Sequence, residues 1–265
     1  MKDLVMHKLT YGELSADLMC WATEAFTGLE ESQIPDTLVL SPFPIERLFS
    51  EFLTIVNTEG FASQTVKCGY LVRSKDAEVL FCRTGIGASI FADITNVLCN
   101  CQNTKTILFV GTAGGLCDQV QTMDLNVPLS CLRLDKVLEV LLPLDAPANA
   151  DSQLADQIRT SLENNMTEVG ITVHTQPHAT VPFITCETEA FLLDLQQRGI
   201  WTVDMELSVL YALASHYQIR SAGILLVEDL PLHGLPFWKC RDIKVELKQQ
   251  VQNKILQTIL QNTLC

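Results

Sequence analysis

Three short segments contain residue types that could carry out chemistry, and the first of them is rich in glycine. Gly111-Thr112-Ala113-Gly114-Gly115 follows an apolar, strand-like run over residues 106–110. Glycines let the backbone approach a ligand closely, and Thr112 adds a hydroxyl beside backbone amides. The segment lacks the lysine of a Walker loop and does not match G-x-G-x-x-G, so neither a nucleoside triphosphate nor a dinucleotide is predicted. The alternative without a ligand is a tight turn.

Two carboxylates lie two residues apart in the second segment, Asp204-Met205-Glu206. At that spacing they cannot share one helix face, so at least one of them is free to point into a cleft. A carboxylate accepts strong, charge-assisted hydrogen bonds from two neighbouring sugar hydroxyls. The structural alternative is that these acidic residues cap the amino terminus of a helix.

The third segment is Glu228-Asp229, which follows the strongly apolar run of residues 223–227. Burial at the end of such a strand would raise the pKa of a carboxyl group and make it a general acid. The alternative is a solvated start of a loop. His174, His178 and His233 are not spaced for a metal, so each is predicted to be structural or exposed, and neither a metal nor a cofactor is predicted.

All three segments fall at junctions in an alternating order of strands and helices. Expected strands cover residues 37–40, 64–72, 78–83, 106–110, 170–174 and 219–227, and expected helices cover 48–53, 84–99, 151–162, 187–197, 204–216 and 244–260. The polar turn at residues 73–76 predicts a hairpin. The repeated order predicts an α/β fold of three layers, α/β/α, with a central mixed sheet. In such a sheet, ligands bind beyond the carboxyl ends of strands.

The first 36 residues read as a separate leader. Its apolar residues recur at helical spacing, which predicts an amphipathic helix: Leu14, Leu18, Trp21, Ala22, Ala25 and Phe26. We therefore expect an N-terminal helical extension over residues 1–36 and one domain over residues 37–265.

Composition excludes several classes of partner. The formal net charge of −13 and the lack of any Lys/Arg-rich run argue against nucleic acid. No apolar run is long enough to cross a bilayer, and the amino terminus does not resemble a secretory signal. The ten cysteines are scattered through apolar segments without metal-ligand spacing. They are predicted to be reduced core residues of a cytoplasmic protein.

In this order and spacing, the segments resemble the nucleoside phosphorylase family. That family includes uridine and purine nucleoside phosphorylases and the methylthioadenosine/adenosylhomocysteine nucleosidases. The resemblance runs through residues 37–262, and the motifs that carry it are Arg83-Thr84-Gly85-Ile86-Gly87, Val110 to Leu116, Pro182-Phe183-Ile184, Val203 to Glu206 and Val227-Glu228-Asp229. It implies a phosphorylase/hydrolase-like fold and cleavage of an N-glycosidic bond.

The resemblance also implies roles for individual residues. Asp229 and Glu206 would be the catalytic pair, Asp229 protonating or holding the base nitrogen and Glu206 accepting hydrogen bonds from the sugar. Phe183 would stack on the base. The Gln and Arg that grip uracil in uridine phosphorylases stand here as Glu187 and Glu189, which favours a purine-type base. The substrate-binding residues implied are Thr112, Ala113, Gly114, Phe183, Ile184, Asp204 and Met205.

The phosphate site departs from the family pattern. Phosphorolytic members carry a Pro-Gly-Asp-Pro-x-Arg loop and an Arg before the glycine segment, because an anionic nucleophile needs guanidinium partners. Here these places read Ser41-Pro42-Phe43-Pro44-Ile45-Glu46-Arg47 and Phe109, and the usual Gly-Asp after the glycine segment is Met123-Asp124. The residues proposed for a nucleophile or phosphate site are Glu46, Arg47, Lys67 and Thr84.

Water is therefore the favoured nucleophile, with Glu46 as its base. Two alternatives stay open: phosphorolysis, with phosphate as a further partner, and a non-catalytic relative that binds or stores a nucleoside. Because family members complete their sites with a neighbour's residues, the resemblance implies a homo-oligomer, either a dimer or a trimer of dimers.

Overall fold

The structure is a computed structural model, and it describes residues 16–45, 58–62, 67–73, 77–240 and 245–263. The helix expected over residues 48–53 lies outside them. The α-helices are α1 Ala16–Thr27, α3 Ala88–Asn100, α4 Ser152–Met166, α5 Glu189–Gln197, α6 Leu207–Tyr217 and α7 Val245–Thr263. The strands are β1 Thr37–Ser41, β2 Thr58–Ala62, β3 Lys67–Arg73, β4 Glu78–Arg83, β5 Thr106–Gly115, β6 Leu125–Asn126, β7 Cys131–Arg133, β8 Val173–His174, β9 His178–Thr180, β10 Thr202–Asp204 and β11 Arg220–Asp229.

The described strands form one mixed sheet. Its main path runs β2-β3-β4-β1-β5-β10-β9-β7, and β11 pairs along the other edge of β5. β1 and β11 are parallel to β5, whereas β10 is antiparallel to it. β3 and β4 are antiparallel, as the predicted hairpin requires, and β2 extends that meander as a strand that we did not expect.

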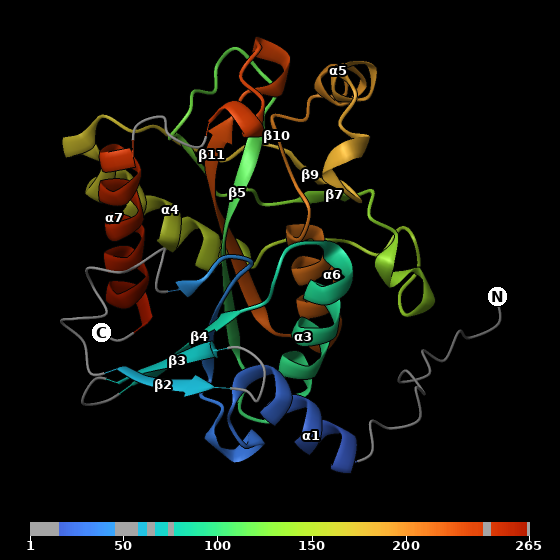
Figure 1. The fold of residues 1–265 in the computed structure, drawn as a ribbon, viewed down its shortest axis with the longest axis vertical. Coiled ribbons are helices and arrows are strands. Elements are labelled where there is room, and N and C mark those ends of the chain that lie inside the picture. The colour runs from blue at the N-terminus through green and yellow to red at the C-terminus, as the bar shows by residue number, and fades with distance from the viewer. Residues whose placement is uncertain (1–15, 46–57, 63–66, 74–76, 241–244, 264–265) are drawn as a thin grey trace.

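Helices cover both faces of the sheet (Figure 1), because the central strands are apolar on both sides. Leu38 and Leu40 of β1 face the core cluster beneath α1, α3 and α6, whereas Val39 between them faces the cluster beneath α4 and α7. The apolar side chains of β5 and β11 alternate between the same two clusters. The predicted α/β fold of three layers with a mixed sheet is confirmed.

The predicted N-terminal helix corresponds to α1, and it packs against α3. Met19 and Ala22 contribute to the same core cluster as the sheet, but Leu18 is exposed and Trp21 is 63% exposed. The buried stripe of α1 is therefore rotated from the one that the apolar spacing predicts. The division of the chain at residue 36 stays a prediction.

The glycine segment is not the strand-loop-helix junction that the sequence predicts. β5 continues through Gly115, because β11 pairs with it from Thr106 to Gly114 and β10 pairs with Gly115, and turns rather than a helix follow it. Glycine is needed here for close approach: a Cβ on Gly111 would lie 2.5 Å from the Phe109 ring, and one on Gly115 would lie 2.7 Å from Leu230. The backbone around the candidate site is thus a strand held by pairing.

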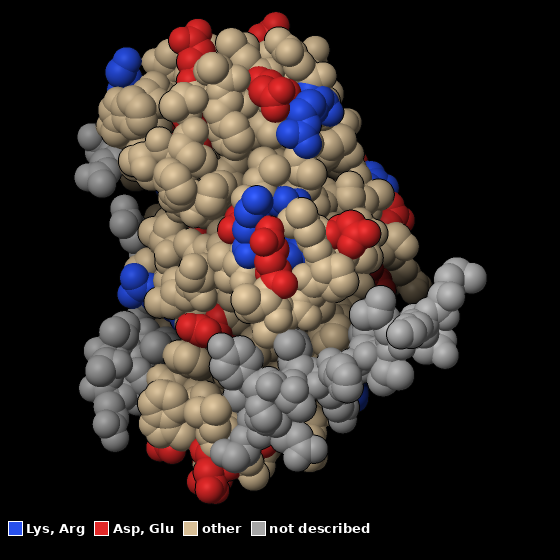
Figure 2. Space-filling view, turned by 90° about the vertical axis from the view of Figure 1, so that its right-hand side faces the viewer, with Lys and Arg blue, Asp and Glu red and all other residues tan. Residues whose placement is uncertain are grey.

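Charged side chains are distributed in small groups of mixed sign. On the face shown in Figure 2, lysines and arginines lie beside aspartates and glutamates rather than in a continuous basic surface. In the described part of the chain, no helix combines the length and apolar character needed to span a bilayer. The eight cysteines whose side chains are described are free thiols, and five of them are buried.

Candidate active site

The candidate site lies where the neighbours of β5 change. On one edge of β5, β1 pairs only as far as Phe109, and β10 pairs from Gly114 onward. Among the described residues, the four positions between them, including Thr112 and Ala113, have no strand partner on that edge. A ligand in an open α/β sheet binds where neighbouring strands diverge at their carboxyl ends. We call this gap between β1 and β10 along β5 the split, and it opens the sheet beside Thr112.

Asp229 lies on the other edge of β5, opposite Gly114, after a bulge in β11. Its carboxyl oxygen is 3.3 Å from the place where a Cβ on Gly114 would stand, so only glycine leaves this position free of a close contact. Val203 of β10 also pairs with Gly114. With strands roughly 4.8 Å apart, Asp229 and Val203 flank Gly114 with backbones about 10 Å from each other.

Burial changes the acidity of Asp229. The residue is only 8% exposed, and burial, reinforced by the nearby charge of Glu187, raises the pKa of Asp229 to about 7. The amide of Phe237 donates a hydrogen bond to its carboxylate and partly opposes this rise. A tight loop makes that contact, because Leu230 and Leu235 pair with each other and return the chain toward the end of β11. Asp229 can thus hold a proton near neutral pH.

Glu206 immediately precedes α6 and is 4% exposed. Its carboxylate accepts a hydrogen bond of 2.6 Å from the backbone amide of Gly87, at the amino terminus of α3. Burial, followed by the charge of Asp204, raises the pKa of Glu206 to about 8, against the lowering effect of the Gly87 and Met205 amides. A second buried carboxyl group therefore lies at the β10 side of the split.

Asp204 is held from several sides inside the protein. Its carboxylate accepts hydrogen bonds from the Thr180 hydroxyl at 2.6 Å and from the Leu207 amide at 2.8 Å, and it lies 2.9 Å from His178. His178 is buried, and its other ring nitrogen lies 2.9 Å from the Thr202 hydroxyl. Asp204 thus anchors the start of α6, and its predicted contact with substrate stays a prediction.

A small third core joins the segments around the split. Cys186, Met205 and Leu232 all pack against it, and they come from three segments distant in sequence. Phe183 lies just before Cys186 and is 55% exposed. Phe183 thus presents a large aromatic side chain at the surface, and its stacking on the base stays a prediction.

A match to a known family decides the interpretation of this arrangement. The sequence model of the phosphorylase superfamily matches residues 39–259. The chain belongs to the phosphorylase superfamily. It is 26% identical over 204 residues to a purine nucleoside phosphorylase of the DeoD type from Clostridium perfringens. The aligned region covers 76% of this chain and 85% of that relative.

Solved structures share the superfamily fold. Uridine phosphorylase from Vibrio fischeri aligns with a TM-score of 0.71 at 17% identity, over 88% of this chain and 95% of that one. AMP nucleosidase from Bacteroides thetaiotaomicron aligns with a TM-score of 0.67 at 17% identity, over 94% of this chain and 99% of that one. The predicted family and the prediction of an enzyme of the nucleoside phosphorylase and nucleosidase class are confirmed.

The remaining predicted residues of this superfamily member fall into three groups. Ala113 is buried at the split, and Thr112 and Ile184 are half-buried. Thr84 is buried and donates a hydrogen bond of 3.1 Å from its hydroxyl to the Ser41 carbonyl, which ties the ends of β1 and β4 together. Glu46, Arg47 and the side chain of Lys67 lie outside the described residues, so their roles stay predictions.

Two departures from the family pattern have visible consequences. Phe109, which stands where phosphorolytic members carry an Arg, is fully buried and packs edge-to-face on Phe91 with ring centroids 5.4 Å apart. Met123 occupies the place of the usual glycine, yet its φ of 82° is in the left-handed region that favours glycine. In this superfamily member a methionine thus adopts a backbone conformation that favours glycine.

The sequence reasoning missed the Gly87 amide as a partner of Glu206. Gly87 has a φ of 105°, which a residue with a side chain rarely adopts, and the paired glycines of Gly85-Ile86-Gly87 were the available signal. The contact itself joins residues 119 positions apart, so no local pattern could have revealed it.

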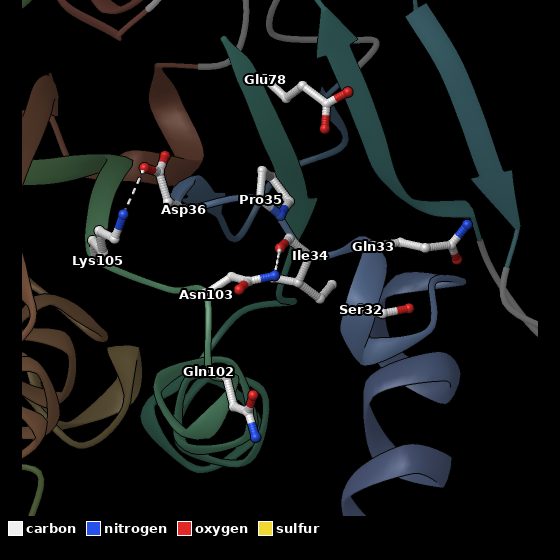
Figure 3. Close-up of a pocket in the computed structure, with 9 residues that line it drawn as sticks. All are labelled: Ser32, Gln33, Ile34, Pro35, Asp36, Glu78, Gln102, Asn103 and Lys105. Atoms are coloured by element: carbon white, nitrogen blue, oxygen red, sulfur yellow. Dashed lines mark hydrogen bonds and ion pairs between the residues drawn. The ribbon is translucent and has the colours of Figure 1, made fainter.

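A hollow of about 350 Å³ lies at the opposite end of the sheet (Figure 3). It is formed around the starts of β1, β4 and β5, where Lys105 pairs with Asp36 at 3.5 Å and Asn103 donates to the Ile34 carbonyl. These polar side chains are exposed or already partnered. The carboxyl ends of the strands, and not this hollow, hold the candidate active site.

Proposed function

We propose that this chain hydrolyses the N-glycosidic bond of a purine-type nucleoside. The observation that carries the proposal is the Asp229 carboxyl group, buried at the end of β11 beside Gly114, with its pKa raised to about 7. An acid with a pKa near the working pH transfers a proton efficiently to a leaving group. A purine offers a ring nitrogen that can take this proton as the bond to the sugar breaks.

Glu206 acts on the sugar side. Its carboxyl group is buried at the split in the sheet, where it can accept hydrogen bonds from ribose hydroxyls. The departing base leaves positive charge on the sugar, in an oxocarbenium-like transition state. Glu206 serves this role in its ionised form, which burial disfavours below about pH 8. As a carboxylate in a site of low polarity, it stabilises that charge more than it stabilises the neutral substrate, which lowers the barrier.

Water fits this site better than phosphate as the nucleophile. The amino terminus of α3 is the natural place for an anion, but the Gly87 amide there is already bonded to Glu206. Asp204 adds a second acidic group directly behind it. A phosphate ion would meet like charge there, whereas water would not. Glu46 remains the proposed base for this water.

Phosphorolysis is the second candidate, because the relatives at 22–26% identity are named purine nucleoside phosphorylases. It requires that Arg47, Lys67 or a neighbouring subunit supply the cations that Phe109 does not. Homo-oligomer formation is part of this candidate.

The test is base release from a panel of purine and pyrimidine nucleosides, with and without phosphate, followed by chromatography of the products. We expect purine release in buffer free of phosphate and free ribose as the second product. Release that depends on phosphate and gives a sugar phosphate establishes phosphorolysis instead. Binding of a nucleoside without release under either condition would leave a non-catalytic binding protein.

A further inference from the structure

His178 is a buried histidine that the proposed mechanism does not use. It begins β9, which runs parallel to β10, and the register places His178 opposite Thr202 and Thr180 opposite Asp204. Side chains in register, and those two residues apart on one strand, lie on the same face of a sheet. These four polar residues therefore form a compact group on one face, and all four are buried.

Hydrogen bonds around Thr202 fix which ring nitrogen of His178 carries the proton. The side-chain oxygen of Asn126 accepts from the Gln176 amide at 3.0 Å, so the nitrogen of Asn126 is the atom that donates to the Thr202 hydroxyl at 2.7 Å. The hydroxyl thus keeps its own proton for Nδ1 of His178, which lies 2.9 Å away. Because Nδ1 accepts, the proton of the neutral ring is on Nε2.

The protonated nitrogen of His178 faces Asp204. Nε2 lies 2.9 Å from Oδ1 of Asp204, and the two side chains are 0% and 1% exposed. The N–H is not in line with that oxygen, so the contact is an electrostatic one between the N–H dipole and the carboxylate. A carboxylate buried to this degree depends on protein donors in place of water.

The Asp204 carboxylate in turn holds the turn that carries Glu206. Its Oδ2 accepts a hydrogen bond of 2.8 Å from the Leu207 amide, which closes a ring around Met205 and Glu206. Glu206 leaves this ring to meet the Gly87 amide at 2.6 Å. A carboxylate that rotated away from Leu207 would release the turn, and Glu206 would no longer be fixed relative to Gly87.

We infer that His178 is a positioning residue for the proposed sugar site, because its Nε2–H holds the Asp204 carboxylate in the orientation that fixes the turn bearing Glu206. The Thr180 hydroxyl donates to the same oxygen at 2.6 Å. One donor leaves a carboxylate free to pivot, whereas two donors from neighbouring strand positions fix its orientation. The inference rests on the proposed function, which places the sugar at Glu206.

Two substitutions separate the two ring nitrogens. A glutamine puts its amide nitrogen near the position of Nε2 and can donate to Asp204, whereas an asparagine reaches only the position of Nδ1. Hydrogen exchange of the Leu207 and Gly87 amides reports on the turn without any ligand. We expect exchange at both amides to be about tenfold faster than in the wild type for His178→Asn, and within about threefold of the wild type for His178→Gln.

The contribution of the ribose to binding is a second readout. Calorimetry compares 9-deazaadenosine and 9-deazainosine, each with its free base. A carbon–carbon bond joins base and sugar in these analogues, so the measurement requires no turnover. We expect the wild type to bind the nucleoside analogue about tenfold or more tightly than its base. This ratio should fall to within about threefold in His178→Asn and be kept in His178→Gln.

His174 supplies a matched control. Its Nε2 lies 3.0 Å from the Asp124 carboxylate, and the two side chains are 13% and 10% exposed. This pair lies where β6 and β8 run side by side, on the part of the sheet beyond β11. His174→Asn should lower the melting temperature and leave unchanged both the exchange at Leu207 and the ribose ratio.

The inference is overturned if His178→Asn, folded by circular dichroism, keeps the wild-type exchange rates or ribose ratio. It is also overturned if His178→Gln loses as much as His178→Asn, since a residue that only fills space does not distinguish the two nitrogens. If His178→Asn does not fold, Thr202→Val decides in its place, because it removes the hydroxyl proton that fixes the tautomer. Exchange at Leu207 should then be about threefold faster or more, and an unchanged rate refutes the inference.

Failure of the inference and failure of the proposed function are separable. A chain in which His178 controls both readouts but which releases no base refutes the proposed hydrolysis alone. A chain that hydrolyses nucleosides while the Leu207 amide is insensitive to His178 refutes the inference alone.

Discussion

At the scale of the residue, two buried carboxyl groups define the chemistry. Asp229 and Glu206 are 8% and 4% exposed, and burial is the largest cause of the raised pKa of each. They differ in their partners, since Asp229 receives the Phe237 amide and faces Glu187, whereas Glu206 receives the Gly87 amide and faces Asp204. In the proposed mechanism their positions distinguish them: Asp229, at the end of β11, protonates the base, and Glu206, just before α6, holds the sugar.

Replacing Asp229 by Asn should lower kcat/KM for base release by roughly 10²–10⁴-fold, the usual contribution of a general acid. In the wild type, the group donates only while protonated. The rate should therefore fall above about pH 7, where Asp229 ionises, and this limb should be missing from the residual activity of the variant. A flat wild-type profile up to pH 9, with full activity in the folded Asn variant, would remove Asp229 from the mechanism.

At the scale of the element, strand ends and a helix terminus bring the site together. β5 lies at the centre of the site, and β10 and β11 pair with it on either side of Gly114. The Gly87 amide, at the amino terminus of α3, binds Glu206. The elements are locally well determined. Asp151, for example, caps α4 through a 2.7 Å bond from the Leu154 amide, and Thr188 caps α5.

Gly87→Ala should impair activity through the backbone. The space around Gly87 is open, so the cost comes from its φ of 105°, and forcing a side chain into such a conformation costs about 1–3 kcal/mol. The shifted amide would release Glu206, and we expect kcat/KM to fall about tenfold or more. Gly170→Ala, at a φ of 67° with equally open space, is the control. It should lower the melting temperature without changing kcat/KM, and equal losses of activity in both variants would contradict the role given to Gly87.

At the scale of the whole molecule, two apolar cores stabilise the sheet, whereas the buried carboxyl groups of the candidate site lower the free energy of unfolding near neutral pH. The folded state holds protons on Asp229 and Glu206 at pH values where the unfolded chain has released them, because both pKa values are raised on folding. The free energy of unfolding therefore decreases, for these groups, as pH rises from about 4 toward 8. Below the unfolded pKa values the penalty vanishes.

Asp229→Asn should remove part of this penalty. The amide cannot ionise, so the variant should gain stability over the wild type as pH rises, by on the order of a few kcal/mol at pH 8 relative to pH 5. The measurement is the difference in melting temperature between the two proteins at each pH, which cancels the titration of all other groups. A difference that stays constant between pH 5 and pH 8 would show that folding does not raise the pKa of Asp229.

The sequence alone determined the order of strands and helices and the segments that carry chemistry. Alternating and helical apolar periods are local properties, so β1, β4, α4, α6 and β11 were predictable. The acidic pairs at Asp204 to Glu206 and at Glu228-Asp229 stood out because charged groups interrupt apolar runs. The family resemblance rested on these same segments, which the superfamily match over residues 39–259 contains.

Only the tertiary structure decided which of those groups face one another. Of the two acidic pairs, Asp204 turns inward to His178, and Glu228 forms an ion pair with Lys248 of α7, whereas Glu206 and Asp229 lie at the split. The pairing of β11 along β5 made a strand of the glycine segment, and the small third core brought together Cys186, Met205 and Leu232 from three separate segments. Sheet register and packing set these contacts between residues far apart in the chain, and neither is encoded in any short stretch of sequence.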